Sequence, residues 1–435
     1  MPRRLGTALL AAAALAAALP AGAGAGAANP WLKQRMAVFA HQGGEDELPS
    51  NTMYALRTSL ARGADWLELD VGATKDGRLV VLHDNKVDRT TNGTGSVNDL
   101  TLVQVQRLDN AYWFVPGRNA VHGLPASRYP FRGVRTGARR APRGFGRNDF
   151  RVATLDEVLR AFPRTPINVE IKGRDGSDQA VYRRNAELLA ALLRRTGRTD
   201  VIVTSFEQSA VDRFHALAPR VPLAPGISGT ADFILGGGSP GPGVVAFQVP
   251  ITFRFGGQLL TITTPDFVRR AHEAGYAVHV WLSNDREDLA TYRSLLSMCV
   301  DGIMAATPLK LERLLRANRI ARPGDRTGTD ACGTRISGVT RVSGGAVTVS
   351  LARKGRSQER RAGTVTLRSR GAGGLHRGTV LGRATYRLAT DQAATTARVV
   401  LSAAARAALA RDGGLPVSAD VFERSPASST LLTLR

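Results

Sequence analysis

The chain has 435 residues, of which 43% are hydrophobic and 22% are charged. This length excludes a single small module, and the ordinary charged fraction excludes a mostly disordered chain. The net charge of +23 is typical of a protein that meets phosphates. The charge is concentrated, because residues 118–151 hold nine Arg and one Asp, and residues 322–435 hold 19 basic and seven acidic side chains. The rest of the chain is close to neutral, and a GC-rich genome alone also produces such an Arg bias.

Residues 1–28 have the composition of a secretory signal peptide. Arg3 and Arg4 precede an apolar run over residues 5–19, and small residues follow it. The run is short and rich in Ala, so a retained membrane anchor is the less favoured alternative. We therefore expect a secreted or extracytoplasmic protein. Its two cysteines, Cys299 and Cys332, are compatible with one disulfide or with two buried thiols.

Short apolar runs alternate with segments of helical period from residue 37 to about residue 318. Helices are predicted over residues 154–162, 181–196 and 265–274, and buried strands over residues 38–40, 66–71, 79–82, 167–171, 201–204, 244–249 and 277–281, with further candidates at 223 and 301–304. This α/β pattern favours an irregular (β/α)8 TIM barrel. An open doubly wound sheet is the alternative, but the Gly-rich turn that it needs after the first strand is missing. The turn between residues 71 and 79 is too short for a helix and predicts a hairpin, so nine candidate strands compete for eight places.

Two segments depart from the barrel pattern. Residues 109–151 lack any period and are rich in Gly, Pro, Arg and aromatic residues, which predicts an insertion. Residues 322–435 show short alternating runs and one helical segment at 403–410, which predicts a small all-β, sandwich-like accessory domain after a barrel domain over residues 29–321. Both segments are rich in Arg, so we expect contact with an anionic envelope or membrane surface, and no nucleic acid, since no recognised module accompanies the charge.

Charged side chains interrupt two of the predicted buried strands. Glu68 and Asp70 are two residues apart and face the same side, as do Glu170 and Lys172. Buried charges are costly unless they are paired or bind a metal. Three carboxylates with one Lys favour a hard divalent cation.

Two histidines follow predicted strands, at the end of a barrel where catalytic groups gather. His41 follows the first strand, and His83 follows the strand over residues 79–82. Two histidines that flank a metal suggest a general acid and a general base.

Several runs, taken together, resemble the glycerophosphodiester phosphodiesterase family, whose barrel is similar to that of phosphatidylinositol phospholipase C. The resemblance covers about residues 37–318. The runs are His41-Gln42-Gly43, Pro49-Ser50-Asn51-Thr52, Gly63-Ala64-Asp65-Trp66-Leu67-Glu68-Leu69-Asp70-Val71, Thr74-Lys75-Asp76-Gly77, Val80-Val81-Leu82-His83-Asp84, Asp88-Arg89-Thr90-Thr91, Glu170-Ile171-Lys172, Thr204-Ser205-Phe206, and Trp281 with Asn284.

The resemblance implies an enzyme that cleaves glycerophosphodiesters to glycerol 3-phosphate and an alcohol through a cyclic phosphate. It implies that Ca2+ or Mg2+ binds to the three carboxylates. His41 would be the base and His83 the acid. Residues expected to contact the substrate are Lys172, Gln42, Trp281 and Asn284.

The chain departs from the family pattern at three points. Gln42 stands where the family usually has Arg, Ser50 replaces a Glu, and Ala305 and Ala306 replace a Thr-Asp pair. These departures concern substrate contacts, and they leave the carboxylates and histidines intact. Two alternatives stay open: lysophospholipase D or phospholipase-like activity on lipids, and a non-catalytic protein that binds the cell envelope.

Three further positions carry structural expectations. His279 alternates with apolar residues and is expected to fill the barrel core. Residues 45–47 form an acidic run that is expected to face solvent. Asn51 precedes a predicted helix and is expected to cap it.

Overall fold

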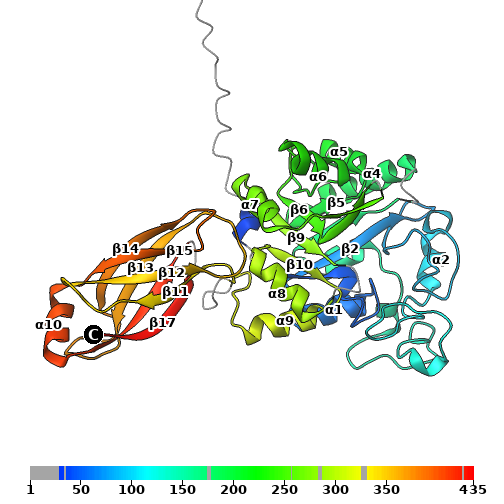
Figure 1. Cartoon of the computed structure of the whole chain (residues 1–435). Helices are drawn as coiled ribbons and strands as arrows, with labels where there is room; N and C mark the ends of the chain where they lie inside the picture. Colours follow the sequence, from blue (N-terminus) through cyan, green and yellow to red (C-terminus); the bar gives the residue numbers. More distant parts are fainter. Residues whose placement is uncertain are drawn as a thin grey trace, which may run out of the picture.

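The computed structural model describes residues 29–33, 36–173, 178–255, 257–282, 287–324, 331–423 and 426–435. Within these ranges an α/β part is followed by an all-β part, and the two lie side by side (Figure 1). None of the described helices is long and apolar enough to cross a membrane. The expected signal segment, residues 1–28, and the expected substrate contact Asn284 lie outside the described residues.

Seven parallel strands form the sheet of the α/β part, in the order β5-β4-β2-β1-β10-β9-β6. Almost all of their residues are buried, which is the pattern of strands covered on both faces. All seven were predicted from their apolar runs. They are β1 (Ala37–Ala40), β2 (Trp66–Ala73), β4 (Ile167–Ile171), β5 (Val201–Thr204), β6 (Ala246–Pro250), β9 (Ala277–Trp281) and β10 (Gly302–Ala305).

Leu223 closes this sheet into a barrel. It makes parallel bridges to Val203 of β5 and to Val244, just before β6. Its N–H donates to the carbonyl of Gly243 at 3.0 Å, and its carbonyl accepts from the N–H of Val245 at 2.9 Å. The eighth strand is thus reduced to one bridged residue, and the predicted irregular TIM barrel is confirmed.

The ninth strand candidate is not part of the parallel barrel. Strand β3 (Leu79–Val81) pairs antiparallel with the end of β2, with Val71 opposite Val81. The connecting turn is closed by Thr74, and Gly77 takes the left-handed conformation (φ 74°) that the turn requires. The predicted hairpin is confirmed, and it places His83 two residues beyond β3.

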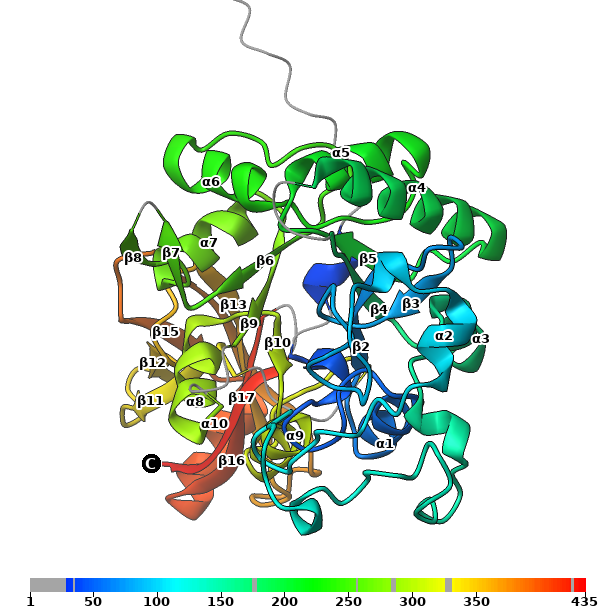
Figure 2. The ribbon, with the colours of Figure 1, turned by 90° about the vertical axis from the view of Figure 1, so that its right-hand side faces the viewer.

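Helices surround the strands (Figure 2). Thr52, Thr154 and Thr264 begin three of them, and each side chain accepts a hydrogen bond from a backbone N–H of the first turn. The apolar helix faces pack on the outer side of the sheet in two large clusters. The helices are α1 (Met53–Ala61), α2 (Leu102–Arg107), α3 (Leu155–Ala161), α4 (Gln179–Thr196), α5 (Gln208–Leu217), α6 (Ile227–Gly236), α7 (Pro265–Glu273), α8 (Leu289–Met298) and α9 (Pro308–Ala317).

Two of the connections after strands are enlarged. Helix α6 follows the bridge at Leu223, and strands β7 (Thr252–Phe255) and β8 (Gln258–Thr261) form an antiparallel hairpin directly after β6. This hairpin is not among the strands predicted from the sequence. Both elements lie on the same side of the barrel (Figure 2).

The barrel interior is filled by a smaller aromatic cluster. The ring of Phe39 lies 4.8 Å from the ring centroids of both Trp66 and His279, and Trp31 packs on Trp66 at 4.5 Å. His279 is 2% exposed. Burial lowers its pKa to about 4, against the opposing charge of Asp301. His279 is therefore a neutral core residue, as expected.

The insertion over residues 109–151 packs against α1. The ring of Tyr54 on α1 contacts the rings of Phe131, Phe145 and Phe150. The guanidinium of Arg132 lies 3.6 Å from the ring centroid of Tyr129. The aromatic residues and this Arg thus form the insertion's own small core.

The all-β part consists of two antiparallel sheets, β11-β12-β15 and β14-β13-β16-β17. Their buried faces share one apolar core, to which α10 adds Ala405 and Ala408. This is the sandwich-like arrangement that the alternating runs predicted. Its elements are β11 (Thr334–Val339), β12 (Ala346–Arg353), β13 (Arg361–Ser369), β14 (Val380–Leu388), β15 (Ala394–Val400), α10 (Ala403–Asp412), β16 (Leu415–Phe422) and β17 (Pro426–Leu434).

The all-β part contacts the barrel where β9 and β10 begin. A disulfide joins Cys299, which precedes β10, to Cys332, which precedes β11, and their Cα atoms are 5.4 Å apart. His272 at the end of α7 lies between Asp301 and Glu359 of the all-β part. The junction therefore lies at the amino-terminal ends of these strands, away from their carboxyl ends.

Candidate active site

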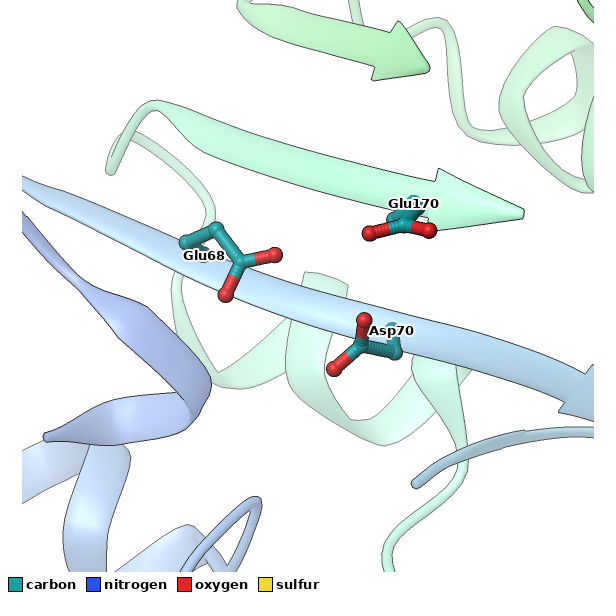
Figure 3. A group of neighbouring side chains, drawn as sticks. All are labelled: Glu68, Asp70 and Glu170. Atoms are coloured by element: carbon teal, nitrogen blue, oxygen red, sulfur yellow. The ribbon is translucent and has the colours of Figure 1, made fainter. Parts of the chain in front are cut away.

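Three carboxylates gather on neighbouring strands of the barrel (Figure 3). Glu68 and Asp70 share one face of β2, and Asp70 stands in register with Glu170 of β4. One oxygen from each carboxylate lies within 4.8 Å of the other two. Glu68 and Asp70 are 2% and 1% exposed. The structure thus brings together the three residues that were expected to hold a cation.

The Lys172 ammonium compensates part of their charge. Its Nζ lies 2.8 Å from Glu170 Oε1 and 3.2 Å from Asp70 Oδ1. Burial alone would raise the pKa of Asp70, but the charges of Lys172, His83 and His41 together outweigh burial and lower that pKa. Burial, with the charge of Asp70, raises the pKa of Glu68. Three carboxylates against one Lys leave negative charge on an all-oxygen donor set, which fits Ca2+ or Mg2+.

Asn51 adds an amide beside these carboxylates. Its Nδ2 lies 3.4 Å from Asp70 Oδ2, and its buried Oδ1 has no hydrogen-bond partner among the described residues. The expectation that Asn51 caps the helix is wrong, because Thr52 Oγ1 accepts the N–H of Ala55 instead. Asn51 is thereby left with a buried amide oxygen next to the carboxylates.

His41 follows β1 and is held by Glu45, a carboxylate outside the cluster of three. Its Nδ1 lies 2.5 Å from Glu45 Oε1, and its Nε2 lies 3.8 Å from Glu68 Oε2. Burial alone would lower the pKa of His41, but Glu45 and Glu68 outweigh it and raise the pKa to about 10. His41 is therefore protonated while these carboxylates keep their charge.

The acidic run after His41 is not solvated, contrary to expectation. Glu45 and Asp46 are 1% and 6% exposed, and Glu47 accepts the backbone N–H groups of Leu309 and Lys310 at the start of α9. The three adjacent acids alone could not show this burial. The turn after β1 brings Glu45 to His41, and the fold brings Glu47 to the N-terminus of α9, which attracts a negative charge.

His83 has a matching arrangement on the other side of the site. Its Nδ1 lies 2.6 Å from Asp84 Oδ1, and Arg89 Nε donates to Asp84 Oδ2 at 2.7 Å. Burial opposes the shift, but hydrogen bonds and charges from His83 and Arg89 lower the pKa of Asp84 to about 2. Asp84 and Arg89 stand in runs that the sequence analysis quoted, without a role assigned to either.

Gln42 is buried beneath the site. Its backbone N–H donates to Glu68 Oε2 at 2.9 Å, and its Oε1 accepts from Ser50 Oγ at 2.7 Å and from Arg89 Nη2 at 3.3 Å. The side chain expected to contact substrate is thus occupied by protein partners. Arg89 brings a guanidinium next to the position where the family usually has Arg.

A cavity of about 370 Å³ opens over these groups. His41, Glu68, His83, Glu170 and Lys172 line it, together with Trp281. The ring of Trp281 lies 5.8 Å from the ring of Phe206, which also lines the cavity. Of the expected site residues, these six face one space.

Comparison with known proteins agrees with this arrangement. The model of the glycerophosphoryl diester phosphodiesterase family matches residues 41–309. A Bacillus subtilis glycerophosphodiester phosphodiesterase is 32% identical over 196 residues, which are 43% of this chain and 58% of that protein. An enzyme of the same name from Caldanaerobacter subterraneus is 28% identical over 64% of this chain and 97% of its own length. The human lysophospholipase D GDPD3 is 28% identical over 65% of this chain and 85% of its length.

A solved structure from Silicibacter pomeroyi, of a protein named for the same class of phosphodiesterase, shares the barrel fold. It is 20% identical, with a TM-score of 0.50 over 66% of this chain and 96% of that one. The family match spans more than half of the chain and includes both histidines and all three carboxylates. The chain belongs to the glycerophosphoryl diester phosphodiesterase family.

Proposed function

We propose that the protein is a metal-dependent phosphodiesterase that cleaves glycerophosphodiesters to glycerol 3-phosphate and an alcohol. The observation that carries the proposal is one cavity lined by two histidines, a lysine and two of three clustered carboxylates. A non-catalytic envelope-binding protein has no need for this set of buried charges, which are costly unless they serve a function.

The two histidines would carry the proton transfers. Glu45 holds Nδ1 of His41, which leaves Nε2 toward Glu68 and the cavity, and Asp84 holds Nδ1 of His83 in the same way. A divalent cation bound to Glu68, Asp70 and Glu170 would offset charge on the phosphate oxygens and on Glu68, one of the carboxylates that raise the pKa of His41. His41 Nε2 removes the proton from the substrate's glycerol hydroxyl, which attacks phosphorus to form a cyclic phosphate. His83 protonates the leaving alkoxide, and the two roles reverse when water opens the ring.

Release of glycerol 3-phosphate from glycerophosphocholine tests this function. The full chain is treated with a chelator and then assayed with Ca2+ or Mg2+, which differ in coordination number and rigidity. We expect activity to return with one of them, and to fall about 10²- to 10⁴-fold in His41→Ala. Absence of release with every divalent cation would overturn the proposal and favour the binding-protein alternative.

We also propose that the protein is exported. Residues 1–28 have the order of a signal peptide, and the Cys299–Cys332 disulfide suits an oxidising compartment. Fractionation of cells that express the full chain, with and without residues 1–28, tests this. Equal retention of both forms in the cytoplasm would contradict export.

The Arg-rich segments would hold the enzyme at an anionic surface. Arg140 and Arg143 of the insertion and Arg383 and Arg387 of β14 are exposed. We expect binding to vesicles with anionic lipid to weaken with salt, and to weaken further when either pair is changed to Ser. Equal binding to neutral and anionic vesicles would contradict this role.

A second candidate, lysophospholipase D activity, is favoured by the apolar side chains that line the same cavity, among them Ile234, Phe253 and Ile262.

A further inference from the structure

The active-site cavity continues into an apolar groove beyond the charged residues. One wall of the groove is α6, and the opposite wall is the β7–β8 hairpin with the residue that follows it. The residues of this groove are Ile227, Ile234, Leu235, Phe253, Leu260 and Ile262.

The hairpin presents one face to the groove and the other to solvent. Phe253 of β7 and Leu260 of β8 are directly opposite each other and both line the cavity. Leu259 points to the other face, because side chains alternate along a strand, and is 60% exposed. The groove is thus built by one defined side of the hairpin.

Large apolar side chains remain exposed around the groove. Leu235 is 81% exposed, Leu260 39%, Phe206 38% and Ile227 37%. Clustered apolar exposure of this kind marks a binding surface, whereas scattered single residues do not. No charged side chain lines the groove on the described residues of α6 or the hairpin.

The groove and the charged site form one space with two chemistries. At one end lie Lys172, the histidines and the carboxylates, which suit a phosphodiester. Phe206 and Trp281 also line this space, and the other end is lined by the apolar side chains of α6 and the hairpin. A ligand that satisfies both ends is an amphiphile with a phosphodiester head and an apolar tail.

We propose that this groove binds the hydrocarbon chain of a glycerophosphodiester that carries a single acyl chain. This inference rests on the proposed function and names its substrate class. A cavity of about 370 Å³ lies near the lower end of the range for ligand pockets, which suits a head group with one chain better than one with two.

A chain-length series tests the groove directly. The substrates are glycerophosphocholine and lysophosphatidylcholines with butanoyl, hexanoyl and octanoyl chains, each used as a monomer below its micelle concentration. Burial of each methylene is expected to raise kcat/KM about fourfold until the groove is filled. Equal kcat/KM across the series would overturn the proposal. Failure to cleave even glycerophosphocholine would instead overturn the proposed function.

Two neighbouring leucines provide a matched pair of variants. Leu260→Asp places a charge in the groove, and Leu259→Asp places the same charge on the opposite face of the same strand. We expect Leu260→Asp to lose at least tenfold in kcat/KM for the octanoyl substrate relative to its own kcat/KM for glycerophosphocholine. Leu259→Asp should keep both activities. If both variants lost the preference for the octanoyl chain equally, or if neither lost it, the assignment of the groove to the acyl chain would be contradicted.

Leu235→Ser serves as a second groove variant, since an exposed helix residue tolerates this change without unfolding. We expect it to flatten the chain-length dependence, and an unchanged slope would count against the groove. The acyl chain could be attached to the glycerol or to the leaving alcohol. A glycerophosphoethanolamine acylated on its amine distinguishes the two, because only the attachment that reaches the groove should show the rise in kcat/KM.

Discussion

Each of the two site histidines has a carboxylate on Nδ1, but the two carboxylates differ in their surroundings. Glu45 is 1% exposed, and His41 lies between it and a second carboxylate, Glu68. Asp84 is partly exposed and is paired with Arg89. One carboxylate therefore adds net negative charge to the site, whereas the other is neutralised. The unneutralised charge of Glu45 is one of the charges that raise the pKa of His41.

Glu45→Gln should move the pH dependence of the reaction. Glu45 is one of the charges that raise the pKa of His41, so its removal lowers that pKa. If His41 is the base, kcat/KM rises with pH as it loses its proton, and the rising limb should move to lower pH by roughly one to three units. Glu47→Gln is the control, because that carboxylate contacts the start of α9 and not His41. A rising limb that stays in place in Glu45→Gln would contradict this role for Glu45.

Asp84→Ala should lower kcat while leaving KM unchanged. Asp84 fixes the orientation of His83 through Nδ1, and an unheld ring donates its proton less well. We expect a loss of roughly ten- to a hundredfold, which is part of the contribution of general acid catalysis. Asp88→Ala is the control, since Asp88 accepts the backbone N–H of Gly95 in an exposed loop. A change in KM alone would point to a role in substrate binding instead.

At the level of elements, the sequence was informative where a buried apolar run, a short turn or a helical period marks the element. The seven parallel strands, the hairpin at β3 and helix α10 all follow from such patterns. The strand at Leu223 is one bridged residue, too short to show a period. The β7–β8 hairpin was missed because each strand has only four residues, and because the adjacent Leu259 and Leu260 deprive β8 of the alternation of a half-buried strand.

The barrel core contains one group whose titration should affect stability. His279 has a pKa of about 4 in the folded protein, against about 6.5 in an unfolded chain. Between these values the unfolded chain binds a proton that the folded protein does not, so the free energy of unfolding falls as the pH drops through 6.5. From pH 7.5 to 4.5 this loss is roughly 2 to 3 kcal/mol.

His279→Leu should remove that part of the pH dependence. Urea unfolding of both proteins at pH 7.5 and 4.5 measures it, and the variant should lose roughly 2 to 3 kcal/mol less than the wild type. Each protein is compared with itself at the two pH values, so the difference in loss does not depend on how well Leu fills the site at pH 7.5. Parallel losses in the two proteins would show that His279 does not carry this dependence.

At the scale of the whole molecule, the two Arg-rich segments, which carry +8 and +12 of the net charge of +23, lie at opposite ends (Figure 1). The insertion follows His83 and reaches the site through His122, whose Nε2 lies 3.0 Å from the carbonyl of Arg89, whereas the all-β part joins the barrel where β9 and β10 begin. TIM-barrel sites lie at the carboxyl ends of the strands, and the opposite end contributes to stability. The all-β part therefore contacts the barrel at the end away from the candidate site, the end that contributes to stability.

The Cys299–Cys332 disulfide should accordingly matter for stability and not for catalysis. It closes a loop across a sequence separation of 33, for which chain entropy predicts a contribution of about 3 to 4 kcal/mol. The double variant Cys299→Ser/Cys332→Ser should melt at a lower temperature and keep the wild-type kcat/KM for glycerophosphocholine below that temperature. Both cysteines belong to the apolar cluster on the outer side of β9 and β10, so serine adds a packing cost to the lost constraint. A loss of activity in the fully folded double variant would show that the junction affects the site. That result would contradict the prediction, because the junction and the site lie at opposite ends of the barrel.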